Sequence, residues 1–570
     1  MQKNGASGLG DDGARRGAAA LAAVQLGICA GRARHRASGR RALPCAAAVI
    51  GKYCARGLHM IFPEQEGGKT MELVFQEKQL DYLGRVLNQT VTQELTAEVI
   101  VPDSCADADR VVDAFGTLLV RAEECTAGSA SVSGEVQAGI LFVTEDGRLE
   151  RLETVIPFSA RRGWEGEQSD CRLQCVCRLC SVDARLVHSR KLLVRVGVSC
   201  VLTVYAAFTR TLHDFPEPAP TLQLRRKHLP LRLPRGLGEK SFSLNEEIEI
   251  PASKPPVERL LKCVYALDTA ERKTIGNKAV FKGRLTVHIL YEAPDGSLQR
   301  QETELPFSQF AELEQDLDEG DLTVFLALTS AETEPDGQLD CRRLLLSAGI
   351  LAQCTVCGEQ PVELIEDAYC LDAELKPQWE TWEMEGILDV QTFRETAQAA
   401  GREPASAIAD GWVLAGEPVR RQENGMAKIE LPLAANVLFT DPAGKLQGQT
   451  LRTNVLLETA LAPQADCRVT EITPGELFCA AGADGVTLRC PVQVTLASTA
   501  RHALKAVCGG TTEPEPEDAR RPGVILRRTE QPEQVWDIAK ACRTAPETVA
   551  AANDLQTDEV PAGTLLLIPM

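Results

Sequence analysis

The sequence lacks features that several large classes of protein require. It has no uninterrupted run of about eighteen apolar residues, so a membrane-spanning helix is not expected. Its 61 Lys and Arg residues are outnumbered by 80 Asp and Glu residues, which gives a net charge of −19. A polyanionic ligand needs a basic surface, so nucleic acid and anionic lipid are disfavoured as main partners.

Motifs for catalysis and cofactor binding are also missing from the sequence. The 7 His residues are scattered, with no pair at metal-ligand spacing, and there is no P-loop, dinucleotide fingerprint or nucleophile elbow. The acidic stretch 312–321 does not fit a calcium-binding EF-hand loop. Read from Asp316, it places Gly320 at the fifth position instead of the sixth, and Ala327 at the twelfth, where a bidentate Glu is needed. We therefore expect no enzyme activity, no metal and no cofactor.

Cysteine, by contrast, is abundant at 20 residues, and four lie between residues 171 and 180. Cys177-x-x-Cys180 has the spacing of zinc ligands, but its possible partner pair, Cys171 and Cys175, lacks the long spacer of a structural zinc site. Cys354-x-x-Cys357 has no second pair nearby, so zinc or redox chemistry there is the weaker alternative. The unpatterned cysteines favour a reducing cytosol. The local period of two predicts a strand with one buried face, formed by Leu173, Cys175, Cys177 and Leu179.

The first seventy residues differ from the rest of the chain. They hold eleven Lys or Arg residues and only four acidic ones. Arg15-Arg16 and the Ala/Leu run to Ala30 imitate a signal peptide, but the five arginines that follow are wrong for a cleaved leader. An export signal, a native tail and a mis-assigned start before Met71 remain open, and the last is the favoured interpretation.

The remaining composition is that of a folded protein. Hydrophobic residues make up 44% and charged residues 25%, and a chain of 570 residues suggests roughly four domains. A duplication organises the middle: residues 98–159 align with residues 247–308 at a constant offset of 149. A weaker third copy resembles both at Leu438–Leu446. This period is far longer than that of a solenoid, so tandem globular units are expected.

Each copy is predicted to be β structure. Val136–Val143 is apolar and rich in β-formers, and the Asp-Gly pairs at 146–147 and 295–296 are strong hairpin turns. Leu192–Val204 resembles a closing strand. Residues 106–114 and 256–261 are expected to form short helical turns.

The C-terminal end reads as a separate small module. Val524–Leu526 and Leu565–Pro569 are expected strands, and two short helices lie between them. Thr544 is the expected N-cap of the second helix, and Trp536 and Leu555 are expected to fill the core. The predicted fold class is mostly β, with tandem β-rich repeat domains and a small β-α-α-β domain. The expected division is 1–70 as a doubtful leader, 71–210, 240–372 and a divergent 378–508 as repeats, 509–522 as a Gly/Pro/acidic linker, and 523–570 as the C-terminal domain.

This C-terminal order resembles a LysM domain, through Val535–Ala539, Asn553–Leu555 and Pro561–Pro569. The resemblance implies a groove for N-acetylglucosamine polymers between the loop after the first strand and the loop before the last. Residues 530–534 depart from the family pattern in that groove, so protein binding stands beside glycan binding. The candidate binding residues are Thr529, Glu530, Gln531, Glu533, Trp536, Asn553, Asp554, Leu555, Gln556 and Thr557.

The tandem β repeats, the opening Val99–Asp103 and the LysM-like end together resemble the SPOCS-domain spore-morphogenesis proteins of spore-forming Firmicutes. The resemblance implies a non-enzymatic scaffold in the mother-cell cytoplasm at the forespore surface. It also implies binding to the coat-basement ATPase and other coat proteins, with the LysM-like domain in that contact. The alternative is a peptidoglycan-binding protein of the wall or cortex.

Overall fold

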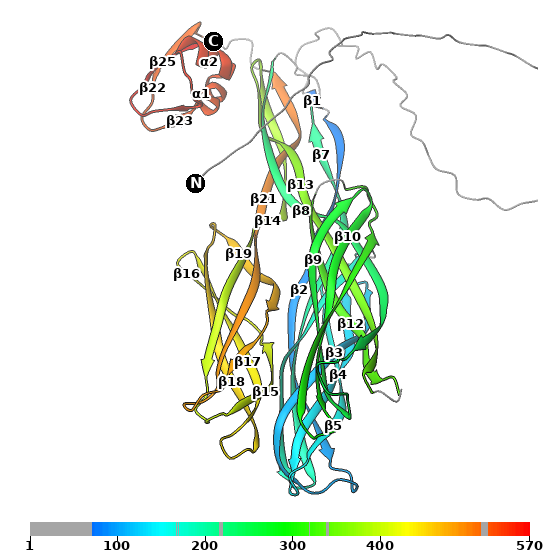
Figure 1. Cartoon of the computed structure of the whole chain (residues 1–570). Helices are drawn as coiled ribbons and strands as arrows, with labels where there is room; N and C mark the ends of the chain where they lie inside the picture. Colours follow the sequence, from blue (N-terminus) through cyan, green and yellow to red (C-terminus); the bar gives the residue numbers. More distant parts are fainter. Residues whose placement is uncertain are drawn as a thin grey trace, which may run out of the picture. The chain divides into compact units, whose positions relative to one another are not determined.

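The computed structural model describes residues 71–570, except for 74, 167, 169, 216–220, 318–319, 338–340 and 515–521. The leader and the acidic part of the expected linker therefore lie outside the described residues. The described part of the chain is mostly β-strand, as predicted, and its helices lie in the C-terminal module (Figure 1). None of these helices is long and apolar enough to cross a membrane.

The first unit is a sandwich of two three-stranded antiparallel sheets, with the orders β2-β7-β6 and β3-β4-β5. Successive side chains of a strand point to opposite faces, so the first half of β4 and the start of β7 alternate between buried positions and positions that are more exposed. Ile140, Phe142, Leu192 and Val194 are buried in the shared core. The strands are β2 (Gln76–Ile100), β3 (Ala108–Thr126), β4 (Ser129–Thr144), β5 (Leu149–Gly163), β6 (Cys171–His188) and β7 (Lys191–Asp214).

The second unit repeats this topology, with sheets ordered β12-β13-β8 and β11-β10-β9. Its core contains Phe281, Val287, Tyr291 and Ile350. The strands are β8 (Leu222–Glu249), β9 (Arg259–Ile275), β10 (Lys278–Glu292), β11 (Leu298–Glu312), β12 (Asp321–Pro335) and β13 (Arg343–Cys370).

The third unit has the same plan with two strands interrupted. β15 and β16 together occupy the place of β9, and β19 and β20 occupy that of β12. β1 (Met71–Leu73) also pairs with β21, whose end includes Gly509–Pro514, the first part of the expected linker. The strands are β14 (Ala373–Ala400), β15 (Ala407–Ala415), β16 (Val419–Glu423), β17 (Met426–Thr440), β18 (Leu446–Ala460), β19 (Ala465–Pro474), β20 (Phe478–Ala480) and β21 (Thr487–Pro514).

The same hairpin turn occurs in all three units. Gly147 N donates to Thr144 O, and the equivalent bonds run from Gly296 N to Ala293 O and from Gly444 N to Asp441 O. The three glycines have φ of 83°, 78° and 79°. Glycine adopts such angles without a steric penalty, so the turns predicted from the Asp-Gly pairs are confirmed.

The expected helical turns are wrong. Ala108–Thr126 and Arg259–Ile275 are strands that pair along β4 and β10. The β-branched residues Val111 and Val112 suit a strand, and Val112 is buried in the first core. Pairing with a neighbouring strand thus outweighs the local helical pattern.

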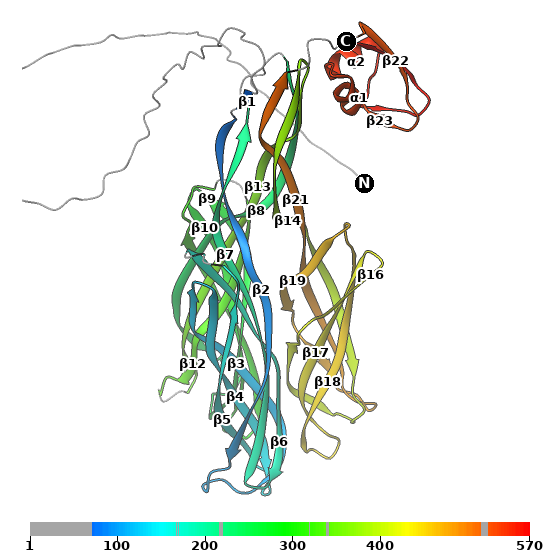
Figure 2. The same cartoon turned by 180° about the vertical axis from the view of Figure 1, so that it is seen from behind.

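The first and last strands of each unit continue beyond its sandwich as a two-stranded ribbon. The three ribbons are β2/β7, β8/β13 and β14/β21 (Figures 1 and 2). They pack on one another through a second apolar core. Its buried members are Leu80 and Leu212 from the first ribbon, Leu231, Leu233, Val362 and Leu364 from the second, and Trp382, Met384, Leu504 and Ala506 from the third.

A buried ion cluster joins the three units at matching positions. Asp113, Lys262 and Asp410 lie opposite Leu141, Leu290 and Leu438, the residues that align in the three sequence copies. Lys262 Nζ lies 2.7 Å from Asp113 Oδ2 and 2.8 Å from Asp410 Oδ2. Burial alone would lower the pKa of Lys262, but the two carboxylates outweigh it and raise that pKa.

Cation–π contacts complete the cluster, because Lys262 also lies 5.1 Å from the ring centroid of Trp412. The Trp412 indole N–H donates to Asp113 Oδ1 over 3.3 Å. Each unit therefore supplies one charged side chain to a single buried site. A buried charge is costly unless it is paired, so the cluster favours this one arrangement of the units.

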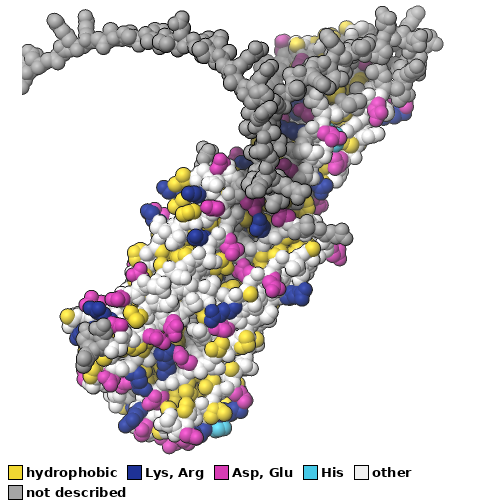
Figure 3. Space-filling model, turned by 90° about the vertical axis from the view of Figure 1, so that its right-hand side faces the viewer, with side chains coloured by type: hydrophobic (Ala, Val, Ile, Leu, Met, Phe, Trp, Pro, Cys, Tyr) yellow, Lys and Arg dark blue, Asp and Glu magenta, His cyan; other side chains and the backbone are white. Residues whose placement is uncertain are grey.

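Basic and acidic side chains are interspersed on the face shown in Figure 3.

Candidate functional site at the junction of the C-terminal module and the ribbons

The C-terminal module follows the order strand, helix, helix, strand. Val535, Ile538, Val549, Leu566 and Ile568 form its buried core. A second short strand pair brings the loop after β22 beside the loop before β25. The elements are β22 (Val524–Arg528), β23 (Glu533–Gln534), α1 (Val535–Cys542), α2 (Pro546–Ala552), β24 (Glu559–Val560) and β25 (Leu565–Pro569).

Two local expectations for this module need correction. The N-cap of α2 is Ala545, and Thr544 instead donates its hydroxyl hydrogen bond to Pro569 O over 2.8 Å. Trp536 and Leu555 are only partly buried and pack against the rim of the core. The aliphatic residues of α1 and β25 are enough to fill so small a core, which leaves Trp536 available for another contact.

Two of the candidate binding residues hold the loops in place. Thr529 is buried, donates to Pro561 O over 2.7 Å and accepts from Thr564 N. Asn553 donates to Leu567 O and accepts from Leu567 N, which ties α2 to β25.

The other candidates lie around these two. Glu533 forms an ion pair with Arg527 at 2.6 Å. Asp554 has a positive φ of 51°, and Leu555 after it is half-buried. The exposed members of the set are Glu530, Gln531, Asp554, Gln556 and Thr557.

Trp536 contacts β13. Its indole N–H donates to Asp367 Oδ2 over 2.8 Å, and its ring meets that of Tyr369 edge-on at 5.0 Å. Lys540, one helical turn further along α1, places its ammonium 2.7 Å from Asp367 Oδ1. Tyr369 donates its phenolic hydrogen bond to Thr544 O over 2.7 Å.

Asp367 is the centre of this junction and is buried, with 7% of its surface exposed. Burial alone would raise its pKa, but the bonds from Lys540 and Trp536 outweigh it and lower that pKa. A β-bulge between Ile365 and Asp367 aims the carboxylate at the module. Sequence reasoning missed Asp367; the available signal was the acidic pair 366–367 between the apolar residues 364–365 and 368–369.

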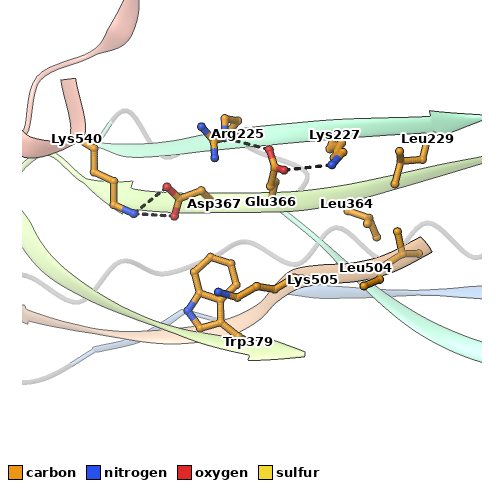
Figure 4. A pocket seen from close by; sticks show the side chains of 11 residues that line it. Arg225, Lys227, Leu229, Leu364, Glu366, Asp367, Trp379, Leu504, Lys505 and Lys540 are labelled. Atoms are coloured by element: carbon orange, nitrogen blue, oxygen red, sulfur yellow. Dashed lines mark hydrogen bonds and ion pairs between the residues drawn. The ribbon is translucent and has the colours of Figure 1, made fainter. Parts of the chain in front are cut away.

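A pocket of about 390 Å³ opens beside this junction (Figure 4). β8, β13, β14 and β21 line it, and α1 contributes Lys540. Glu366 binds Arg225 at 3.2 Å and Lys227 at 3.4 Å. The lining residues are Arg225, Lys227, Leu229, Leu364, Glu366, Asp367, Trp379, Ala503, Leu504, Lys505 and Lys540.

The cysteine face predicted for β6 is confirmed. Cys175 is buried in the first core, and Leu173, Cys177 and Leu179 pack against it. Burial raises the pKa of Cys354 to about 12 and that of Cys357 to about 11, which leaves little reactive thiolate at neutral pH. The described residues contain no cluster of three or more side chains suited to hold a metal.

The family described as "SipL, SPOCS domain" matches residues 256–332. The match covers β9, β10, β11 and most of β12 in the second unit. No curated protein and no solved structure matches the chain. A SPOCS domain indicates a function related to sporulation.

Proposed function

We propose that the protein is a non-enzymatic scaffold of spore morphogenesis that helps to localise the coat to the forespore surface. The match of residues 256–332 to a SPOCS domain carries this proposal. The scaffold acts in the mother-cell cytoplasm. Its partners are the coat-basement ATPase and other coat proteins.

The geometry favours a divided role within the chain. The three units share a buried ion cluster and a common ribbon core, which suits a rigid body. The C-terminal module, LysM-like in its sequence, is the partner-binding part. Its side-by-side loops present Glu530, Gln531, Gln556 and Thr557 to solvent.

Co-precipitation with the coat-basement ATPase tests this assignment. The double variant Gln531→Arg with Gln556→Arg should reduce capture at least tenfold, because both changes place bulky charges on exposed loops. Lys428→Glu, an exposed change on β17 of the third unit, should leave capture unchanged. Full capture by the double variant would reject the loops as the contact.

Two observations distinguish the scaffold function from the peptidoglycan-binding alternative. Titration with chitin oligomers should show no binding. A fluorescent fusion should form a shell around the forespore in a sporulating cell. Saturable glycan binding together with a diffuse or wall-associated fusion would replace the scaffold by a glycan-binding function.

A further inference from the structure

The pocket beside the junction is basic within an acidic protein. Four cationic side chains line it, from Arg225, Lys227, Lys505 and Lys540, against only two carboxylates, from Glu366 and Asp367. The whole chain carries a charge of −19. A basic pocket in such a protein concentrates anions from its surroundings.

The two carboxylates are already engaged. Asp367 accepts hydrogen bonds from Lys540, from the Trp536 indole and from the backbone N–H of Ala368. Glu366 is shared between Arg225 and Lys227. Arg225 also lies 4.0 Å from Asp537 Oδ1, so three carboxylates oppose the four cations. One positive charge therefore remains for a ligand to neutralise.

Lys505 provides the most available of these charges. Its ammonium lies 4.0 Å from the ring centroid of Trp379, which is 38% exposed. Among the residues that the structure describes, no carboxylate lies within ion-pair distance of Lys505. The cation–π contact holds the ammonium at the pocket without cancelling its charge.

One end of the pocket lining is apolar, because Leu229, Leu364 and Leu504 lie together there, away from Lys540 (Figure 4). Leu364 and Leu504 are buried. A suitable ligand therefore carries an anionic head on a short aliphatic stem. The glutamate side chain has this form. A segment with several glutamates would reach Lys227 and Lys505 on opposite walls of the pocket together.

We propose that this pocket binds an acidic, glutamate-rich segment of a partner protein. The segment lies between the ribbons and α1, and its carboxylates pair with Lys505 and Lys227. Bound there, it contacts both the body and the C-terminal module and holds them together. The proposal deepens the scaffold function and rests on it for the identity of the partner.

Fluorescence anisotropy of the full chain with a labelled octaglutamate peptide tests the pocket directly. Binding should be saturable at low salt and weaken as ionic strength rises. Lys505→Glu with Lys227→Glu should weaken it at least tenfold, while Lys505→Arg should retain it. Lys278→Glu is the matched control, because Lys278 lies over Phe310 at 4.7 Å in a similar contact on β10. Thermal unfolding of each variant checks that the fold is intact.

Several results would overturn the proposal. Octaglutamate binding that survives the double charge reversal, or that Lys278→Glu weakens equally, would place the peptide elsewhere. Equal binding of octaglutamine would show that charge is not recognised. Displacement by inorganic phosphate at equal concentration would indicate a small-anion site instead of a peptide site.

The pocket and the scaffold function fail separately in these measurements. A parent chain that captures the ATPase but does not bind octaglutamate rejects the pocket alone. Octaglutamate binding by a protein that captures no coat protein rejects the scaffold function alone.

Discussion

At the scale of single residues, glycine is required where a strand passes close to a neighbouring ring. A Cβ on Gly134 would collide with Leu119 O and the ring of Phe158, and Gly283 meets Asp268 O and Phe307 at the matching place. The two glycines are separated by the 149-residue offset of the repeats. The sequence repeat therefore preserves a packing constraint as well as a turn.

Gly134→Ala should destabilise the protein by about 1–3 kcal/mol, because the methyl group forces backbone or ring displacement. Urea unfolding measures the loss. Gly523→Ala is the control, since nothing lies within 4 Å of its Cβ position, and it should be neutral. If Gly134→Ala were as stable as the parent, the backbone at Leu119 and the ring of Phe158 would accommodate the methyl group at little cost.

Glu123 makes stability depend on pH. Burial and the nearby Glu239 raise its pKa to about 7, against the opposing hydrogen bond from Gln353. The folded state then holds a proton that the unfolded state has released, so stability falls as pH rises from about 4.5 to about 7.

Glu123→Gln should remove up to about 3 kcal/mol of this pH dependence. Urea unfolding at pH 5 and pH 7.5 measures it, with the exposed neighbour Glu124→Gln as control. If the stability of Glu123→Gln changed with pH as much as that of the parent, Glu123 would not be the source of the pH dependence.

At the scale of elements, α1 docks on the bulge of β13 through Asp367. A hydrogen bond to a charged group contributes about 1.5–3 kcal/mol, and Asp367 makes several to the module. The pKa of Asp367 lies below its ordinary value, so the contact is present at neutral pH and is lost only as pH falls through that lowered value.

Asp367→Asn should release α1 and speed its amide hydrogen exchange about tenfold or more, because the ion pair with Lys540 is lost. Hydrogen exchange with mass spectrometry measures the change. Glu366→Gln, which contacts Arg225 and Lys227 on β8 instead, should leave α1 protected. Unchanged protection in Asp367→Asn would show that the apolar contact with Tyr369 suffices.

At the scale of the whole molecule, the three units meet at one buried charge from each. The sequence offset places Asp113 and Lys262 at equivalent positions, yet the charges are opposite. Three identical acids or three lysines would repel one another at this site. The unlike charges therefore favour one order of the units around the cluster.

Lys262→Ala should cost about 3–5 kcal/mol, because it leaves two carboxylates buried without their cation. Lys262→Met with Asp113→Asn and Asp410→Asn should recover much of that loss by removing the charges together. Chemical denaturation of both variants measures the difference. A triple variant no more stable than Lys262→Ala would show that the cluster does more than neutralise charge.

The sequence by itself determined the local structure of this protein. Asp146-Gly147 and Asp295-Gly296 predicted the hairpins, the alternation around Cys175 predicted a strand face, and the constant offset predicted units of one kind. These features depend on backbone angles and on the two-residue period of a strand, which neighbours in the sequence control.

Only the tertiary structure decided which surfaces meet. Nothing in the sequence marks Asp113, Lys262 and Asp410 as partners, and Asp113 falls in a segment predicted to form helical turns. Trp536 reads as a core residue. A two-residue period tells which face a side chain occupies but not what lies against it. The partners come from segments more than a hundred residues away. The packing of β3, β9 and β15 therefore decided the buried cluster, and the docking of α1 on the bulge at Asp367 decided the junction.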